Sequence, residues 1–429
     1  MCIRDRTISK TLSLIFLLGA TALPAAAQDY FISNARLVTN SSDGIIEDAD
    51  ILIRSGKIVQ IGTNLVAPAD VEILHADGKW ITSGIIAPFS TLGLVDIGGE
   101  DATNDISSKG SHTSVSELAS DSFNPKAASI ANTRRRGVTH AVISPRAAGH
   151  SIFGGTGLIA NLTGEYDSIE TEQAFVYVQL GAQGTSRSGG SRASSFRQLR
   201  AALDDAGAYP SRFDGPDDGD ALSRQDAAAL FKAAKGRMPL LIAANRASTL
   251  LNIIKLKKDY GNLNIIVLGA AEGWKVANQL AEAKIKVMID PHENLPSSFD
   301  QVEARLDNVV LLDAAGVDYA ITNVGVLGVS KPVTLTQHAG NAVGNGLSWD
   351  KAFAAVTSTP AEWFGISNTG VSSGQSATLV MWDGDPLNVT SAPTFMMIDG
   401  EQQSLKSRQT ALRDRYNPTS DDTRPHKYR

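Results

Sequence analysis

The middle of the chain alternates short apolar runs with alanine-rich stretches, and this alternation constrains the fold most. PLLIAA at 239–244 and NIIVLGA at 264–270, for example, are each followed by a stretch with helical periodicity. Strands that alternate with helices at this pitch are typical of parallel βα units. We therefore predict a (β/α)8 barrel over residues 84–368, with active groups at the C-terminal ends of its strands. A doubly wound open sheet is the rival architecture, but the glycine cluster at 153–157 is more typical of a turn than of a phosphate loop.

Both ends of the chain have a different pattern, in which short apolar runs alternate with turn signals. Residues 28–83 indicate antiparallel strands, with hairpin corners at Ser55-Gly56-Lys57 and Ala76-Asp77-Gly78. A second strand-rich patch covers residues 369–410 and precedes a polar tail at 411–429. The two patches predict one small β-sandwich built from both termini.

The first residues have the order of a secretory signal peptide. Residues 1–27 begin with basic side chains, continue with a short apolar run and end with Ala25-Ala26-Ala27, so we predict cleavage after Ala27 and a periplasmic or secreted protein. Elsewhere no stretch approaches the roughly 18 uninterrupted apolar residues of a membrane helix, so no membrane span is predicted. The only cysteine, Cys2, lies in the predicted leader, which excludes a disulfide from the mature chain.

The balance of charges limits the classes of partner. The chain has 39 basic and 45 acidic residues, and removal of three basic residues and one acidic residue with the leader leaves 36 against 44. A net negative charge disfavours nucleic acid and anionic membranes as partners. A small-molecule ligand or substrate fits this charge, and a homo-oligomer or pairing with an intact paralogue stays open.

Several motifs resemble the amidohydrolase superfamily, and within it the exported imidazolonepropionase-like branch. ADILIRSGKIVQIG at 49–62 and TSGIIAPFSTLG at 82–93 look like the opening of that family. NGLSWDKAFAAVTSTPAEWFGI at 345–366 resembles its last barrel helix, and GQSATLVMWDGDPL at 374–387 resembles its closing strand pair. The resemblance implies a barrel with a composite sandwich and a hydrolase of C–N bonds that holds one or two divalent ions.

The resemblance also implies metal ligands at the ends of particular barrel strands, and this chain departs from that pattern. The first strand of the family ends in His-x-His, the fifth and sixth strands each supply a histidine, the eighth supplies an aspartate, and the fourth supplies a bridging group. Here those positions hold poor or non-coordinating side chains: Phe89, Thr91, Gln179 or Gln183, Asn245, Gly269, and Asn323 or Val324. Zinc prefers imidazole, thiolate and carboxylate ligands. We therefore predict no metal ligands and no cofactor at this site.

A few other residues are alternative candidates for chemistry. His150, Asp290 and His292 follow predicted strands and are weak candidates for an unorthodox metal or acid-base site. Arg246 and Glu272 are candidates for binding a small charged molecule, although a structural ion pair explains them as well. Packing, capping or surface roles are the safer interpretation of the remaining histidines, which are His75, His112, His140, His338 and His426.

Three hypotheses follow from this sequence, of which a purely structural exported domain ranks last. The first is an exported amidohydrolase homologue that is metal-poor or catalytically inactive and acts as a binding or partner protein. The alternative is an active hydrolase of a small cyclic or linear amide, with zinc held by unorthodox ligands.

Overall fold

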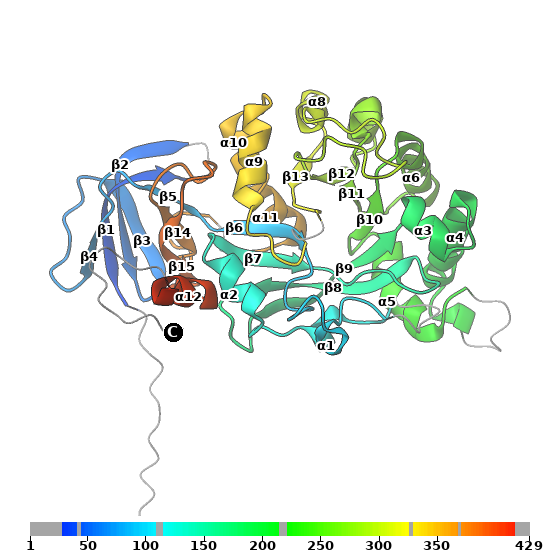
Figure 1. Ribbon diagram of the computed structural model, residues 1–429, viewed down its shortest axis with the longest axis horizontal. Helices are drawn as coiled ribbons and strands as arrows, with labels where there is room; N and C mark the ends of the chain where they lie inside the picture. Colours follow the sequence, from blue (N-terminus) through cyan, green and yellow to red (C-terminus); the bar gives the residue numbers. More distant parts are fainter. Residues whose placement is uncertain are drawn as a thin grey trace, which may run out of the picture.

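The protein has two lobes, a sheet formed by both chain ends and a larger barrel beside it (Figure 1). The structure is a computed structural model that describes residues 28–40, 44–108, 115–213, 221–325, 329–367 and 370–416. The predicted leader, His112 and His426 lie outside the described residues. Every helix among the described residues is too short or too polar to cross a bilayer.

Strands from the two ends of the chain form one eight-stranded sheet, which we call the terminal sheet. Its order is β16-β15-β14-β5-β1-β2-β3, and β4 also pairs with β1. The junction between the ends is the antiparallel pairing of β5 with β14. The predicted composite of both termini is confirmed, and its strands are β1 (Tyr30–Val38), β2 (Ile45–Arg54), β3 (Lys57–Thr63), β4 (Glu72–His75), β5 (Trp80–Ser83), β14 (Leu379–Trp382), β15 (Pro393–Ile398) and β16 (Glu401–Gln402).

One of the two predicted hairpin corners of this sheet is correct and the other is wrong. Ser55 and Gly56 both have positive φ and join the antiparallel strands β2 and β3, as a two-residue hairpin turn requires. The turn at 76–78 joins β4 to β5, but both of these strands pair in parallel with β1. The chain therefore continues in the same direction after this turn, and β4 and β5 lie one after the other along β1.

The barrel is a second eight-stranded sheet in which the strands follow one another in chain order from β6 to β13. The runs that form β10 and β11 are apolar and buried along their whole length, as strands covered on both faces must be. This confirms the predicted barrel, whose strands are β6 (Ile85–Ser90), β7 (Val138–Ile143), β8 (Phe153–Asn161), β9 (Ile169–Gln179), β10 (Leu240–Ala244), β11 (Ile265–Gly269), β12 (Lys286–Ile289) and β13 (Tyr319–Ile321).

The third strand departs from the predicted all-parallel pattern, because β8 runs antiparallel to both β7 and β9. The connections on either side of it, residues 144–152 and 162–168, are shorter than the dozen or so residues that a parallel crossover needs. The glycine cluster at 153–157 lies in this strand. A Cβ on Gly157 would come 2.1 Å from the ring of Phe175, so the glycine permits close packing of β8 on β9.

The seam between the first and last strands is closed by a short piece of chain. The amide of Ile86 in β6 donates to the carbonyl of Val356 at 2.8 Å, and the amide of Ile321 in β13 donates to the carbonyl of Ala355 at 2.9 Å. Residues 355–356 thus satisfy both edges, because each edge finds backbone partners in the same linker.

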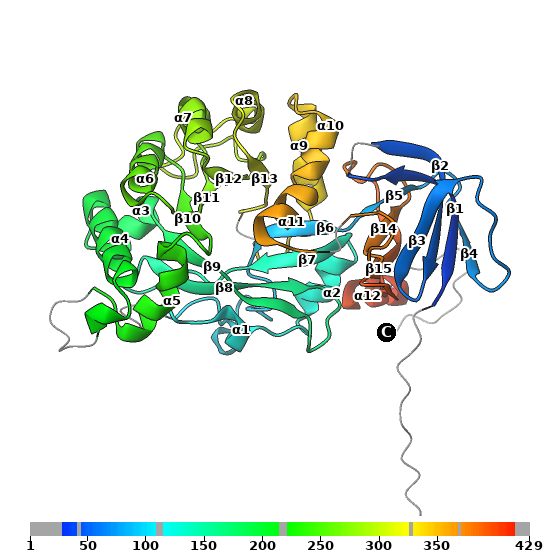
Figure 2. The same cartoon turned by 180° about the vertical axis from the view of Figure 1, so that it is seen from behind.

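Helices cover the outer face of the barrel (Figure 2). Ser191 and Ser223 cap α4 and α5 through their hydroxyl oxygens, as is common at helix N-termini. The helices are α1 (Ala119–Ser122), α2 (Ala128–Arg134), α3 (Gly181–Arg187), α4 (Arg192–Gly207), α5 (Arg224–Ala234), α6 (Ala247–Tyr260), α7 (Ala277–Glu282), α8 (Asn308–Ala314), α9 (Leu335–Gly344), α10 (Trp349–Ala354), α11 (Ser358–Phe364) and α12 (Arg408–Tyr416).

The interior of the barrel is filled by side chains that point inward from alternate strand positions. Phe175, Leu241 and Ile266 belong to one buried cluster, and Ala361 and Trp363 of α11 pack into it. Helix α11 thereby contributes to the barrel interior as well as following the linker that closes the seam. The interior is a packed core rather than a channel.

A tryptophan of the terminal sheet contacts the barrel at the junction of the lobes. Trp382 in β14 is almost fully buried, and its indole N–H donates to the hydroxyl of Thr82 at 3.0 Å. A Cβ on Gly137, just before β7, would lie 2.2 Å from this ring. Only glycine therefore fits at that position. The predicted domain boundaries at residues 83, 368 and 410 stay predictions.

Candidate functional site at the barrel rim

The carboxyl ends of the parallel barrel strands meet at one end of the barrel, which we call the rim. Barrel strands of this kind place their C-terminal side chains around a common opening. The end of each strand or the residues that follow it therefore supply the candidate site. The rim brings together Phe89, Thr91, Gln179, Asn245, Gly269, Asp290 and Asn323.

Aromatic packing occupies the rim where β6 and β9 end. Phe89 stacks on Tyr177 with ring centroids 6.0 Å apart, and both side chains are buried. The hydroxyl of Tyr177 donates to Oε1 of Gln179 at 2.6 Å. Burial raises the pKa of Tyr177 to about 12, although the positive charges of Arg146 and Arg187 oppose that rise. Tyr177 is therefore a neutral hydrogen-bond donor, and two arginines lie near it.

Asn245 and Gly269 interlock where β10 and β11 end. Gly269 has a φ of +105°, and a Cβ at this position would lie 2.2 Å from Oδ1 of Asn245. The same Oδ1 accepts the amide N–H of Ala271 at 3.3 Å. The Asn245 amide thus takes up the space into which any side chain at position 269 would have to project.

A buried aspartate organises the other side of the rim, where β12 ends. Asp290 is only 6% exposed. Its Oδ1 accepts from the amide of His292 at 3.0 Å and lies 2.7 Å from Nδ1 of His338. Its Oδ2 accepts from the amide of Val324 at 3.0 Å. Three groups from three segments therefore converge on one carboxylate.

Two further side chains complete this group, which we call the rim cluster: Asp290, His292, Glu293 and His338. The rings of His292 and His338 lie with centroids 5.3 Å apart. Burial and the negative charge of Asp290 raise the pKa of Glu293 to about 7, while a hydrogen bond from Gln301 opposes the rise. A carboxyl that titrates near neutral pH beside an aspartate-bound imidazole is an arrangement suited to acid-base chemistry.

Comparison with known proteins supports the architecture. No model of a known protein family matches the sequence. The chain is 24% identical to the protein called amidohydrolase tasK of Hapsidospora irregularis over an alignment of 395 positions that covers 82% of this chain and 40% of that relative. Among solved structures, an amidohydrolase from Thermotoga maritima superposes with a TM-score of 0.76 at 22% identity, covering 87% of this chain and 99% of that chain. A molinate hydrolase superposes with a TM-score of 0.54 at 15% identity, covering 89% and 95%.

The protein has the amidohydrolase fold. The predicted resemblance to the amidohydrolase superfamily is thus confirmed. The assignment of particular rim residues to vacated ligand positions is a finer statement and stays a prediction.

The rim of this amidohydrolase fold does not fit a divalent ion at the ends of the first, fifth and sixth strands. Phe89 and Gly269 have no side-chain donor atom, and the side-chain oxygen of Asn245 already accepts a hydrogen bond. Amide oxygens are also poor ligands for zinc compared with imidazole and carboxylate. Asn323 points its amide nitrogen at the hydroxyl of Thr334, at 2.7 Å.

The remaining predicted residues are distributed around the rim without joining the rim cluster. His150 is exposed on the short connection between β7 and β8. Arg246 is exposed just before α6, whereas Glu272 is buried and accepts the amide N–H of Ala247 at 3.0 Å. That contact gives Glu272 a structural role at the first turn of α6, where a carboxylate is favourable. Their parts in ligand binding stay predictions.

Sequence reasoning missed His338 as a partner of Asp290. His338 lies in α9, well after β13, and its pattern is that of an ordinary helical residue. The available signal was its position in the first turns of the helix that follows the last barrel strand, because such a turn faces the rim. The prediction that the chain has no metal cofactor is not supported, because another group of side chains, described below, offers three ligand atoms close together.

Proposed function

We propose that this protein is an amidohydrolase homologue whose rim binds a small organic molecule and does not hydrolyse it through a rim-bound metal ion. The interlock of Asn245 with Gly269 is the observation that carries this proposal. A histidine at position 269 would have to displace the Asn245 amide and would also need a backbone conformation that side-chain-bearing residues rarely adopt. This packing supports the prediction that these two strands supply no metal ligands.

The polar groups of the rim support a ligand that carries a carboxylate. The guanidinium of Arg187 donates from one terminal nitrogen to the carbonyl of Gly149 at 3.5 Å, while its Nε is buried without a hydrogen-bond partner among the described residues. A buried donor without an acceptor is costly unless something else satisfies it. Arg146 adds a second positive charge near Tyr177. A carboxylate is the natural partner of such a donor because arginine binds it in a paired geometry.

The rim cluster on the other side supports an amide as the rest of the ligand. Asp290 and Glu293 supply acceptors, and the imidazoles of His292 and His338 supply donors or acceptors according to their tautomer. An amide presents one donor and one acceptor, so it matches this mixture. The proposed ligand class is therefore a small N-acyl amino acid or a related cyclic amide.

Ligand binding is tested by thermal denaturation of the mature protein with a panel of N-acetyl amino acids. At least one compound is expected to raise the unfolding midpoint of the wild type, and Arg187→Gln is expected to weaken that binding about tenfold. Arg197→Gln is the matched control, because Arg197 is an exposed arginine on the neighbouring α4. Equal weakening by both substitutions would contradict the proposal.

The absence of metal-dependent hydrolysis is tested on the same panel with one equivalent of zinc. We expect no zinc-stimulated release of acetate from any compound. Turnover that requires zinc and disappears in Asp290→Ala would overturn the proposal.

A second candidate function is hydrolysis of a C–N bond with His338 as general base. The 2.7 Å contact between Asp290 and Nδ1 of His338 favours it, because a carboxylate that accepts from Nδ1 leaves Nε2 with a lone pair to accept a proton. This function predicts metal-independent turnover that is lost in His338→Gln. In this second candidate function the substrate would still be a C–N bond, as in the family, but His338 would replace the metal ion as the catalytic group.

We further propose that the protein acts outside the cytoplasm. The order of basic, apolar and small residues over 1–27 supports this proposal. Mass spectrometry of the protein purified from its native host should find an N-terminus at Gln28. Retention of the leader would contradict it.

A further inference from the structure

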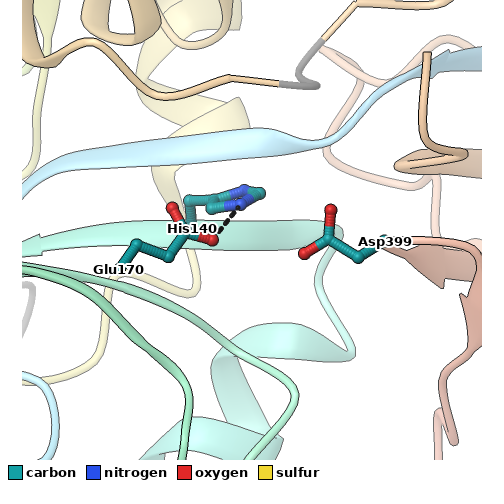
Figure 3. A group of neighbouring side chains, drawn as sticks. All are labelled: His140, Glu170 and Asp399. Atoms are coloured by element: carbon teal, nitrogen blue, oxygen red, sulfur yellow. Dashed lines mark ion pairs between the residues drawn. The ribbon is translucent and has the colours of Figure 1, made fainter.

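A second group of titratable side chains lies at the opposite end of the barrel from the rim, which we call the floor. It combines His140 of β7, Glu170 of β9 and Asp399 of the turn between β15 and β16 (Figure 3). His140 lies near the start of β7, and Glu170 is the second residue of β9. One ligand atom from each residue lies within 4.8 Å of the other two. The barrel and the terminal sheet thus meet at three side chains whose chemistry suits a metal ion.

His140 can present a ring nitrogen to a metal ion. The hydroxyl of Thr139 lies 3.0 Å from Nδ1 of His140 and donates to the carbonyl of Ile85 at 3.4 Å. In the tautomer whose Nδ1–H donates to this hydroxyl, Nε2 carries the lone pair that a metal ion needs. Metal-binding histidines commonly have this arrangement, in which the second nitrogen donates to a fixed oxygen.

The available nitrogen of His140 faces a carboxylate. Nε2 lies 3.2 Å from Oε1 of Glu170, and the imidazole is 1% exposed. In that tautomer a lone pair faces the carboxylate oxygen, which is repulsive unless a cation lies between them. The pair is therefore joined either by a proton on Nε2 or by a bound cation. The third residue, Asp399, distinguishes these two because a single proton does not need a second carboxylate.

Asp399 is held in place by the geometry of its turn. Asp399 and Gly400 both have positive φ and join β15 to β16 as a two-residue hairpin turn. The amide of Asp399 donates to the hydroxyl of Thr378 at 3.0 Å. A Cβ on Gly400 would lie 2.3 Å from the Cα of Gly56, so this turn packs tightly against the turn between β2 and β3. The carboxylate is thus aimed at the floor by a rigid part of the terminal sheet.

The electrostatics of the group favour an added positive charge. The imidazole of His140 is buried, whereas Glu170 and Asp399 are exposed to solvent. Two carboxylates beside one imidazole carry net negative charge, and a divalent ion would neutralise it.

A cavity beside the group leaves room for a fourth ligand. It has a volume of about 390 Å³, and both Glu170 and Asp399 line it. The other walls come from β8, β9 and the end of α11: Ile159, Thr171, Gly365, Ile366 and Ser367. Water occupies a roomy polar site of this kind readily, because it needs only a few polar partners.

We propose that His140, Glu170 and Asp399 bind one divalent transition-metal ion, with zinc as the preferred ion and water as the fourth ligand. One imidazole and two carboxylates form a ligand set that zinc accepts, and three protein ligands leave one position open to the cavity. The ion ties the terminal sheet to the barrel floor. This site is independent of the rim and of the function proposed for it.

The test is calorimetric titration of zinc chloride into the mature protein after treatment with a chelator. One zinc ion per chain is expected, and saturating zinc should raise the unfolding midpoint by at least about 2 °C because the ion binds only the folded state. Glu170→Gln and Asp399→Asn are each expected to weaken zinc binding at least tenfold while leaving the fold of the metal-free protein intact. Asparagine tolerates the positive φ of position 399, so Asp399→Asn keeps the turn.

Glu172→Gln is the matched control, because Glu172 is exposed on the same strand and its substitution removes the same charge. Zinc binding that is absent in the wild type, or equal in the wild type and Asp399→Asn, overturns the floor site. Zinc lost in Asp290→Ala but retained in Asp399→Asn would overturn both the floor site and the metal-free function proposed for the rim.

Discussion

The rim and the floor of the barrel differ in where their ligand atoms are directed. At the rim, the side chains at the ends of the strands are engaged with one another: Phe89 stacks on Tyr177, and Asn245 fills the space above Gly269. At the floor, an imidazole and two carboxylates converge, and Nε2 of the imidazole faces one of the carboxylates. Among the described residues, three potential metal ligands thus gather at the floor and not at the opening usually associated with chemistry in this fold.

The comparison shows that the position of a site in a fold does not determine whether its side chains can bind a metal ion or another ligand. The barrel positions strand ends around a common opening whatever their side chains are. Binding depends on donor atoms that remain free after local hydrogen bonds are formed. The comparison can be sharpened or broken by substitutions at each end.

The largest effect is expected at Asp290, on which three segments of the rim depend. Asp290→Ala leaves the amides of His292 and Val324 and the imidazole of His338 without their acceptor, so we expect a loss of about 4 kcal/mol in the free energy of unfolding. Urea denaturation measures it. Asp167→Ala, at an exposed aspartate, should stay within about 0.5 kcal/mol. A small loss at Asp290 would mean that the rim cluster is not a cooperative unit.

The second-largest effect is expected where Asn245 packs over Gly269, at the ends of β10 and β11. Gly269→Ala forces a Cβ to 2.2 Å from the Asn245 oxygen at a positive φ, and we expect a cost of about 3 kcal/mol. Gly78→Ala also has a positive φ but open space around its Cβ, so it should cost about 1 kcal/mol. Equal costs by urea denaturation would show that the rim can accommodate a side chain at position 269, which weakens the proposed contrast.

The titration of Glu293 gives the rim a pH dependence. Its pKa is raised from 4.5 to about 7, so the folded state binds the proton more tightly than the unfolded state. This contribution to stability is complete below pH 4.5 and is lost as the pH rises through about 7. We expect a loss of about 2 kcal/mol, below the roughly 3 kcal/mol that the full shift would give, because the side chain is partly solvated. Glu293→Gln should remove this slope, and an unchanged slope would assign it to another group.

A smaller effect at the floor tests the orientation of His140. Thr139→Val removes the oxygen that faces Nδ1, and zinc binding should weaken about tenfold, or about 1.4 kcal/mol. Val is close in shape to Thr, so the strand should keep its packing. Unchanged zinc affinity in calorimetry would mean that the hydroxyl does not orient the ring.

The smallest effect is expected at His150. Because its side chain is exposed on a connection outside the rim cluster, His150→Ala should change neither stability nor ligand binding by more than about 0.5 kcal/mol. A larger loss of ligand binding would extend the rim site to this connection.

The sequence predicts much of the fold because apolar periodicity records which segments are buried. It does not show the direction of β8, since a buried strand has the same pattern in either direction, and only the short connections at 144–152 and 162–168 signal a reversal. Asp290 and His292 follow a recognisable strand and are found from sequence as rim candidates. Pairs such as Asp290 with His338 depend on how a helix docks, which local patterns do not encode.

The floor group is harder to predict from sequence, because its three members, residues 140, 170 and 399, lie far apart in the chain. His140 has the pattern of an ordinary buried strand residue, and a packing role is the safer interpretation from sequence alone. Only the junction of the terminal sheet with the barrel brings Asp399 to it.

The pairing of β5 with β14 has a consequence for the order of events during synthesis. Thr82 and the Trp382 that binds it are 300 positions apart, so the first strands of the terminal sheet leave the ribosome long before their partners exist. Closing so long a loop carries a large entropic cost, which a barrel that has already folded in between would reduce. The early strands must therefore wait with an unpaired edge, and a chaperone that shields that edge would help the nascent chain more than the finished protein.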